Sequence, residues 1–146
     1  MTRALVVYRS HSGVTRRYGE EIAEFFRGRH IAAQVASVGD CDMAALSDVD
    51  YLLLGCWTSG LFVVRQRPDL AWRSFVCDMP SVPTPAPTTP KVGLFTTYKV
   101  ATGSQFPKMR AALEGKTAPP TLELKSRTGH LSPADEKALE RFLAGI

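Results

Sequence analysis

Continuous apolar runs of strand length recur along the chain, and small polar residues follow each of them. The clearest runs are 4–8, 51–54 and 92–95. Segments this apolar are typical of strands that are buried on both faces of a parallel sheet. Two further candidates, 31–35 and 121–125, contain more polar residues. We therefore expect these two strands at the edges of the same sheet.

Amphipathic patterns separate these strands. Apolar side chains recur every three or four positions in the segments 18–26, 72–79, 106–113 and 139–143, which is the spacing of one helix face. Ser132 supplies a helix start signal before the last of them. Strands that alternate with helices at these lengths require crossover connections, and therefore parallel strands.

The pattern as a whole predicts an α/β fold, a doubly wound three-layer α/β/α sandwich around a five-stranded parallel sheet. The strand order 2-1-3-4-5 fits best, because it places the two more polar strands at the edges. A length of 146 residues fits a single domain over 1–146, with a proline-rich linker at 80–90 before the fourth strand. In this fold, ligands bind beyond the carboxyl ends of the strands.

Composition narrows the setting of the protein. No apolar run is long enough for a signal-peptide core or a membrane span, so we expect a cytoplasmic protein that does not enter a membrane. Cys41, Cys56 and Cys77 form no C-x-x-C pair, and no histidine lies at metal-ligand spacing from them. We expect reduced thiols and no metal site.

Net charge raises the question of nucleic acid. The formal charge is +4 and the isoelectric point is near 9.1, values that a nucleic-acid-binding protein could also have. Many basic residues, however, alternate with Glu or Asp on the predicted helices, as solvated helix faces do. We therefore expect no nucleic-acid partner.

The loop after the first strand has the composition of a phosphate site. It reads Ser10-His11-Ser12-Gly13-Val14-Thr15 and leads directly into a helix. Hydroxyl groups, a glycine and the unpaired N–H groups of a helix start suit a phosphate monoester. The alternative is structural: Ser12 caps the helix and Gly13 eases the turn. His11 would attract the phosphate if protonated, or else point to solvent.

Other phosphate chemistries fail on missing residues. The chain contains no Gly-Lys-Ser/Thr for a nucleotide triphosphate loop, and no Gly-x-Gly-x-x-Gly opens the first helix. A receiver domain would need an aspartate after the third strand, where the sequence reads Gly55-Cys56-Trp57. A cysteine-dependent phosphatase would need a thiol in the first loop.

One large aromatic residue follows each of the next two inner strands. Trp57 lies among Gly, Ser and Thr after the third strand, and Tyr98 lies in a similar setting after the fourth. Two such rings could stack on both faces of a flat tricyclic ligand. The alternative is that they are core or rim aromatics, the usual place of such residues.

Taken together, these motifs resemble the flavodoxin family, and the resemblance runs over nearly the whole chain. The phosphate loop is similar to the family's Thr/Ser-x-Thr/Ser-Gly-x-Thr motif, and Trp57 and Tyr98 stand at its two flavin-stacking positions. No insertion interrupts 121–126, as in the short-chain type. The resemblance implies that FMN is the cofactor, held without any catalytic side chain. The implied binding residues are Ser10, His11, Ser12, Gly13, Val14, Thr15, Trp57, Thr58, Ser59, Gly60, Thr97, Tyr98 and Gly103.

The charges around this predicted site depart from the family pattern. Flavodoxins are typically acidic, whereas 9–17, 57–67 and 98–105 contain no Asp or Glu. These segments carry basic residues instead: Arg9, Arg16, Arg17, Arg65, Arg67 and Lys99. Positive charge favours the reduced flavin anion, so the reduction potential should move upward. It also suggests an acidic redox partner protein or an anionic small-molecule acceptor.

Three functions remain open from the sequence. The first is an FMN-binding electron-transfer protein. The second is an FMN-dependent reductase that passes electrons from NAD(P)H to a quinone or similar acceptor, although no nicotinamide motif is present. The third is an interaction module with this fold and no flavin.

Overall fold

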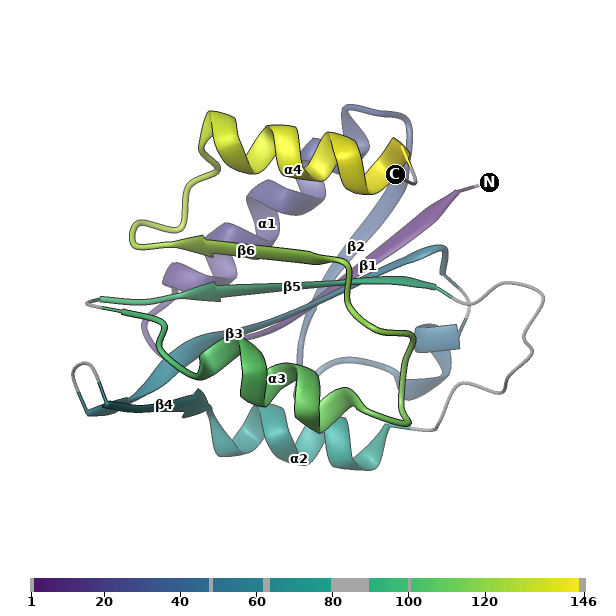
Figure 1. The fold of residues 1–146 in the computed structure, drawn as a ribbon. Helices are drawn as coiled ribbons and strands as arrows, with labels where there is room; N and C mark the ends of the chain where they lie inside the picture. Colours follow the sequence, from purple (N-terminus) through teal and green to yellow (C-terminus); the bar gives the residue numbers. More distant parts are fainter. Residues whose placement is uncertain (1, 48, 62–63, 80–89, 100, 145–146) are drawn as a thin grey trace.

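The computed structural model describes residues 2–47, 49–61, 64–79, 90–99 and 101–144 (Figure 1). All of the predicted linker except Pro90 therefore lies outside the described residues. The elements follow in the order β1 (Arg3–Arg9), α1 (Val14–Arg27), β2 (Ala32–Ser37), the 3₁₀ helix η1 (Met43–Ser47), β3 (Tyr51–Leu61), β4 (Val64–Pro68), α2 (Leu70–Asp78), β5 (Lys91–Thr97), α3 (Gln105–Leu113), β6 (Leu122–Ser126) and α4 (Pro133–Ala144).

The sheet confirms the predicted strand order. Its parallel strands lie in the order β2-β1-β3-β5-β6, with the two more polar strands at the edges. The inner strands are in close register, since Leu5 aligns with Leu52 and Leu54 aligns with Leu94. Because side chains alternate along a strand, each inner strand sends apolar residues to both faces.

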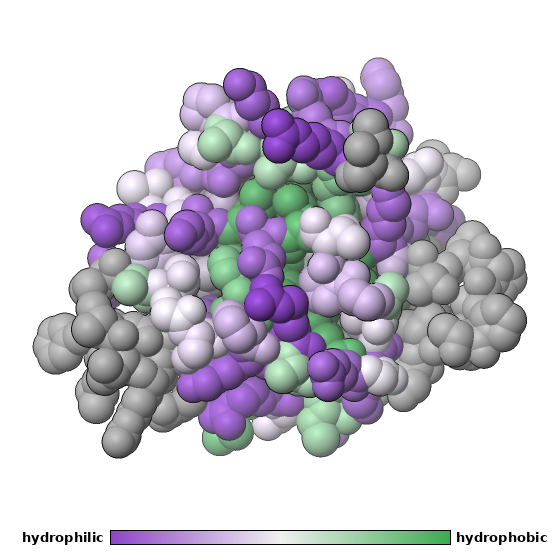
Figure 2. Space-filling view, in the orientation of Figure 1, coloured by the Kyte–Doolittle hydropathy of each residue, from purple (hydrophilic) through white to green (hydrophobic). Residues whose placement is uncertain are grey.

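Two hydrophobic cores result, one on each face of the sheet. Helices α1 and α4 cover one face and α2 and α3 cover the other (Figure 1). In the same view, hydrophobic residues gather between the two helix layers and hydrophilic residues cover α4 (Figure 2). The largest fully buried helix side chains are Tyr18, Ile22, Phe26, Trp72, Met109, Leu113 and Leu139.

One strand was missed by the sequence pattern. The apolar run ends at Leu54, but β3 continues to Leu61 and pairs with the antiparallel β4, with Ser59 opposite Arg67. The small polar residues after Leu54 were interpreted as a loop, yet pairing with β4 satisfies their backbone groups within a hairpin. Thr58, Ser59 and Gly60 therefore lie on a strand, and a bulge between Ser59 and Leu61 bends it.

Two helix starts show how local sequence sets the fold. At α4, the Ser132 hydroxyl accepts the Asp135 N–H and the Asp135 carboxylate accepts the Ser132 N–H, both at 3.1 Å, which confirms the start signal. At α2, the N-cap is Asp69, whose carboxylate accepts the Ala71 N–H at 2.7 Å. No helix that the structure describes is long and apolar enough to cross a membrane.

Candidate functional site

The carboxyl ends of β1, β3 and β5 meet at one edge of the sheet. Arg9 at the end of β1 aligns with Cys56, and Trp57 aligns with Thr97 at the end of β5. Tyr98 follows Thr97 directly. The phosphate-type loop and both predicted stacking residues are therefore brought to one place.

The loop before α1 is shaped by Gly13. Gly13 is the N-cap of α1 and has a φ of 91°, a backbone conformation that glycine adopts at little cost. Its N–H donates to the Ser10 hydroxyl at 2.8 Å. Ser12 is exposed and does not occupy the cap position. The first turn of α1, which begins at Val14, contains no acidic residue, so the positive end of the helix dipole is not offset there.

Thr15 links this loop to β5. It is buried, and its hydroxyl oxygen lies 2.6 Å from that of Thr97. Each hydroxyl carries one hydrogen, so whichever group accepts in this pair keeps its own hydrogen for another partner. Two residues predicted for different parts of the ligand thus share one hydrogen bond.

Trp57 is held from two directions. It is half-buried, and its indole N–H donates to the Asp69 carboxylate at 2.9 Å. The same carboxylate accepts a hydrogen bond from Arg9 Nε at 3.3 Å. His11 is exposed, and its ring stacks on Trp57 with 4.7 Å between centroids and 28° between planes. The histidine of the phosphate-type loop therefore contacts the predicted stacking residue.

Tyr98 has different neighbours. It is half-buried, and its backbone N–H donates to the Ser126 carbonyl at 3.2 Å, which ties the residue to β6. The Arg127 guanidinium carbon lies 5.4 Å from the centre of the Tyr98 ring, and Lys125 Nζ lies 5.9 Å from it. Both distances are within the range of cation–π attraction.

A polar network lies beneath the hairpin of β3 and β4. The Thr96 hydroxyl donates to the Cys56 carbonyl at 2.6 Å and lies 2.9 Å from the Thr58 hydroxyl. Gln105, which is fully buried at the start of α3, donates from Nε2 to the Trp57 carbonyl at 3.1 Å. Its Oε1 has no hydrogen-bond partner among the described residues. Hydrogen bonds thus hold both the backbone carbonyl and the indole of Trp57.

Cys56 is a structural residue here. It is fully buried, and its sulfur accepts the Asp69 N–H at 3.2 Å. Burial raises the pKa of the Cys56 thiol to about 12, so the nucleophilic thiolate is not populated near neutral pH. The remaining predicted residue, Gly103, is exposed in the turn before α3, with a φ of 51°.

No protein-family model matches the sequence, and no curated protein sequence matches it. Among solved structures, it is similar to the two-electron reduced flavodoxin of Megasphaera elsdenii (TM-score 0.77, 21% identity, covering 98% of this chain and 99% of that one). It is also similar to flavodoxin 1 of Bacillus cereus (TM-score 0.70, 19% identity, covering 99% of this chain and 99% of that one). A third similar structure is a short-chain flavodoxin associated with a bacterial microcompartment (TM-score 0.73, 15% identity, covering 99% of this chain and 96% of that one).

The chain has the flavodoxin fold. All three identities are low, and the likeness extends over nearly the full length of each chain. The flavodoxin-like doubly wound architecture predicted from the sequence is therefore confirmed.

The charge pattern within this flavodoxin fold requires a correction. The sequence predicted only basic residues around the site, but Asp69 lies beside Trp57 and pairs with Arg9. Arg16 is likewise paired, with Glu20 at 3.1 Å. This carboxylate lies two residues beyond the segment 57–67, which contains no Asp or Glu. The cations beside Tyr98 are Lys125 and Arg127, which lie outside the three segments predicted to surround the flavin.

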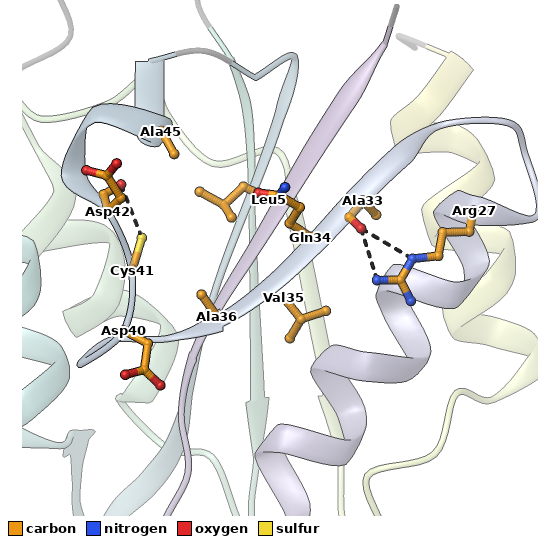
Figure 3. A pocket seen from close by; sticks show the side chains of 10 residues that line it. All are labelled: Leu5, Arg27, Ala33, Gln34, Val35, Ala36, Asp40, Cys41, Asp42 and Ala45. Carbon is orange, nitrogen blue, oxygen red and sulfur yellow. Dashed lines mark hydrogen bonds between the residues drawn. The ribbon is translucent and has the colours of Figure 1, made fainter.

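A separate depression lies at the β2 edge of the sheet (Figure 3). It has a volume of about 410 Å³ and contains none of the predicted flavin-binding residues. Within it, the Arg27 guanidinium donates two hydrogen bonds to the Ala33 carbonyl, at 3.0 and 3.3 Å. This side chain occupies an edge-strand acceptor that another strand could otherwise use.

Proposed function

We propose that this chain binds FMN between Trp57 and Tyr98 and acts as an electron carrier. The observation that carries the proposal is the register of β3 and β5. It aligns Trp57 with Thr97, the last residue of β5, so Tyr98 follows one position beyond Trp57 on the neighbouring segment. A planar ring between two others needs about 7 Å between them, twice the van der Waals contact distance. Side chains from adjacent strands can span such a gap, because neighbouring strands are separated by about 4.8 Å.

The residues around the loop before α1 fit the phosphate of FMN. Ser10 uses its hydroxyl oxygen as the acceptor for Gly13, so its hydroxyl hydrogen stays available to a ligand. Ser12 is exposed beside it, and the first-turn N–H groups of Val14 and Thr15 have no partner within the helix. An anion at this helix end would be stabilised by both the N–H groups and the dipole.

The protein's own contribution is binding, orientation and charge. Bound FMN would supply the electron-accepting and electron-donating chemistry. Thr58, Ser59 and Gly60 on β3, together with Thr97 and Gly103, would lie along the ring. No side chain of the site is required as an acid, base or nucleophile, and the Cys56 thiol is too weakly acidic to serve as one. Electron transfer to and from the partner would take place in the cytoplasm.

The proposed partner is a redox protein with an acidic contact surface, or an anionic small molecule. Lys99, Lys125 and Arg127 are exposed near Tyr98, where they could meet carboxylates. Such attraction would mainly raise the association rate, and the rate would fall with added salt. Electron-transfer rates that do not respond to salt would contradict this part of the proposal.

The site is tested by FMN fluorescence titration of Trp57→Ala and Tyr98→Ala. Loss of one stacking ring should weaken FMN binding at least about fivefold, since a stacked aromatic pair contributes about 1 kcal/mol beyond its buried area. Tyr51→Ala, an aromatic truncation at the opposite end of β3, is the matched control and should bind FMN as the wild type does. Equal affinity in all four proteins would refute the stacking site.

NADPH oxidation by the same samples distinguishes the electron carrier from the reductase. An electron carrier should not oxidise NADPH when quinones are added, whereas a reductase would turn over. Steady turnover by the FMN-loaded wild type would therefore replace the carrier proposal with the reductase.

A further inference from the structure

Two cations, one at the end of β6 and one just beyond it, lie against the ring of Tyr98. Arg127 and Lys125 are exposed, and their charged groups lie 5.4 and 5.9 Å from the ring centre. Lys125 lies near the end of β6, and Arg127 lies just beyond its last residue, Ser126. The hydrogen bond from the Tyr98 N–H to the Ser126 carbonyl fixes β6 beside the residue.

The strand order assigns these cations to one face of Tyr98. Along the sheet, β3 lies on one side of β5 and β6 lies on the other. Trp57 on β3 therefore lies to one side of Tyr98, and Lys125 and Arg127 lie on the β6 side. His11 reaches Trp57 from β1, on the far side of β3. A flavin ring stacked on Tyr98 from the β3 side would therefore have these two cations on the other side of the tyrosine ring.

These two charges differ from the other basic residues near the site. Arg9 is paired with Asp69 and Arg16 with Glu20, so their fields are partly cancelled. On β6 itself, Glu123 forms an ion pair with Arg110 on α3. Within the part of the chain that the structure describes, no ion pair is formed by Lys125 or Arg127. Their positive charge therefore acts on whatever lies against Tyr98.

We propose that Lys125 and Arg127 set the reduction potential of the flavin by stabilising its reduced form through the Tyr98 ring. The inference rests on the proposed function. Oxidised flavin takes up two electrons and one proton to give a reduced flavin with one negative charge on its ring. Two nearby cations favour this anion over the neutral oxidised ring. The protein should accordingly bind reduced FMN more tightly than a variant that lacks them.

The test compares FMN-loaded wild type with Lys125→Gln/Arg127→Gln in a reductive titration with dithionite, followed by visible absorption. Removing both charges should lower the ratio of the affinities for reduced and oxidised FMN about tenfold, after allowance for solvent screening. For a two-electron couple, this change equals a midpoint potential about 30 mV lower. The affinity for oxidised FMN, measured separately by fluorescence, should change much less.

Two further variants separate charge from packing. Arg127→Lys keeps the charge and should keep the wild-type potential, whereas a shift as large as that of the double variant would show that packing matters instead. Lys137→Gln removes one exposed charge from α4, on the other helix layer, and should leave the potential unchanged. In high salt, the difference in midpoint potential between the double variant and Lys137→Gln should disappear.

The outcomes distinguish this inference from the proposed function. If the wild type binds FMN and the double variant has the same potential, the inference is wrong and the FMN site stands. If the double variant loses its affinity for oxidised FMN, the two residues bind the cofactor and do not tune it. If the wild type fails to bind FMN, the proposed function fails, and the inference fails with it.

Discussion

The two walls of the candidate site are supported by different chemistry. On the Trp57 side, a half-buried carboxylate and a stacked imidazole hold the indole, and Gln105 holds the backbone carbonyl. On the Tyr98 side, two exposed cations lie over the ring. Hydrogen bonds in a partly buried site are directional, whereas exposed charges act over a wider range and are weakened by salt. We infer that the Trp57 wall fixes geometry and the Tyr98 wall supplies charge.

The largest effect should come from removing the carboxylate behind Trp57. Asp69→Ala deletes the N-cap of α2 and leaves the indole N–H and Arg9 without their shared partner. We expect a loss of about 2 kcal/mol in the free energy of unfolding, measured with denaturant, and weaker FMN binding. Asp78→Ala, at an exposed position in the last turn of α2, is the control and should unfold as the wild type does.

Asp69→Asn sharpens the same comparison. Asparagine keeps one acceptor oxygen and replaces the other with an NH2 group, whereas the Asp69 carboxylate uses one oxygen for the Ala71 N–H and Arg9 and the other for the indole N–H. The variant can keep the helix cap or the bond to the indole, but not both, so its stability should fall between those of the wild type and the alanine variant. A stability equal to that of the wild type would mean that the second acceptor oxygen does not support this side of the site.

An intermediate effect is expected beneath Trp57. Gln105→Leu keeps a side chain of similar size but removes the hydrogen bond to the Trp57 carbonyl. The free energy of unfolding should fall by about 1 kcal/mol, because that carbonyl loses its side-chain donor while the unpartnered Oε1 also disappears. Gln34→Leu on the exposed edge strand is the matched control. Identical unfolding curves for the two variants would argue against a role for Gln105.

The smallest effect concerns the loop that follows β6. Glu21 accepts the Leu131 N–H at 3.0 Å and lies 2.5 Å from His130 Nδ1, so it anchors the segment after Arg127. Partial burial opposes ionisation, but the hydrogen bonds and the charges of His130 and Arg17 outweigh it, so the pKa of Glu21 is lowered. Its contribution is present above the usual carboxyl pKa and is lost as pH falls through the lower folded-state value.

Urea unfolding of Glu21→Gln and wild type across acidic pH checks this contribution. The stability difference between the two proteins should be largest near neutral pH and should close as the solution becomes strongly acidic. A difference that is independent of pH would show that the Glu21 charge has no part in holding the loop. The Trp57 wall should not respond to the same substitution.

Sequence patterns revealed the parts of this molecule that depend on local rules. Apolar runs indicated the parallel strands, and the Ser132 signal indicated the start of α4, because strand burial and helix capping depend on residues that are close together in the sequence. The pairing of β3 with β4 was missed, since the apolar run of β3 ends at Leu54, β4 has only five residues, and the two segments are stabilised by pairing with each other. Strand order could be inferred because polarity differs between inner and edge strands.

The candidate site was only partly visible in the sequence. Residues in the loops after β1, β3 and β5 could be assembled by the rule that parallel strands end at one edge. Asp69, Gln105 and Arg127 could not, because each belongs to a helix start or an edge strand and reaches the site only through tertiary packing. Their contacts join residues that are 12, 48 and 29 positions apart in the chain.

Titration of FMN with the wild-type protein tests the central claim most directly. FMN fluorescence should be quenched in a saturable manner with one FMN per chain, because the ring stacks against Trp57 and Tyr98, and riboflavin should bind more weakly because it lacks the phosphate. A colourless protein that leaves FMN fluorescence unchanged would contradict the account.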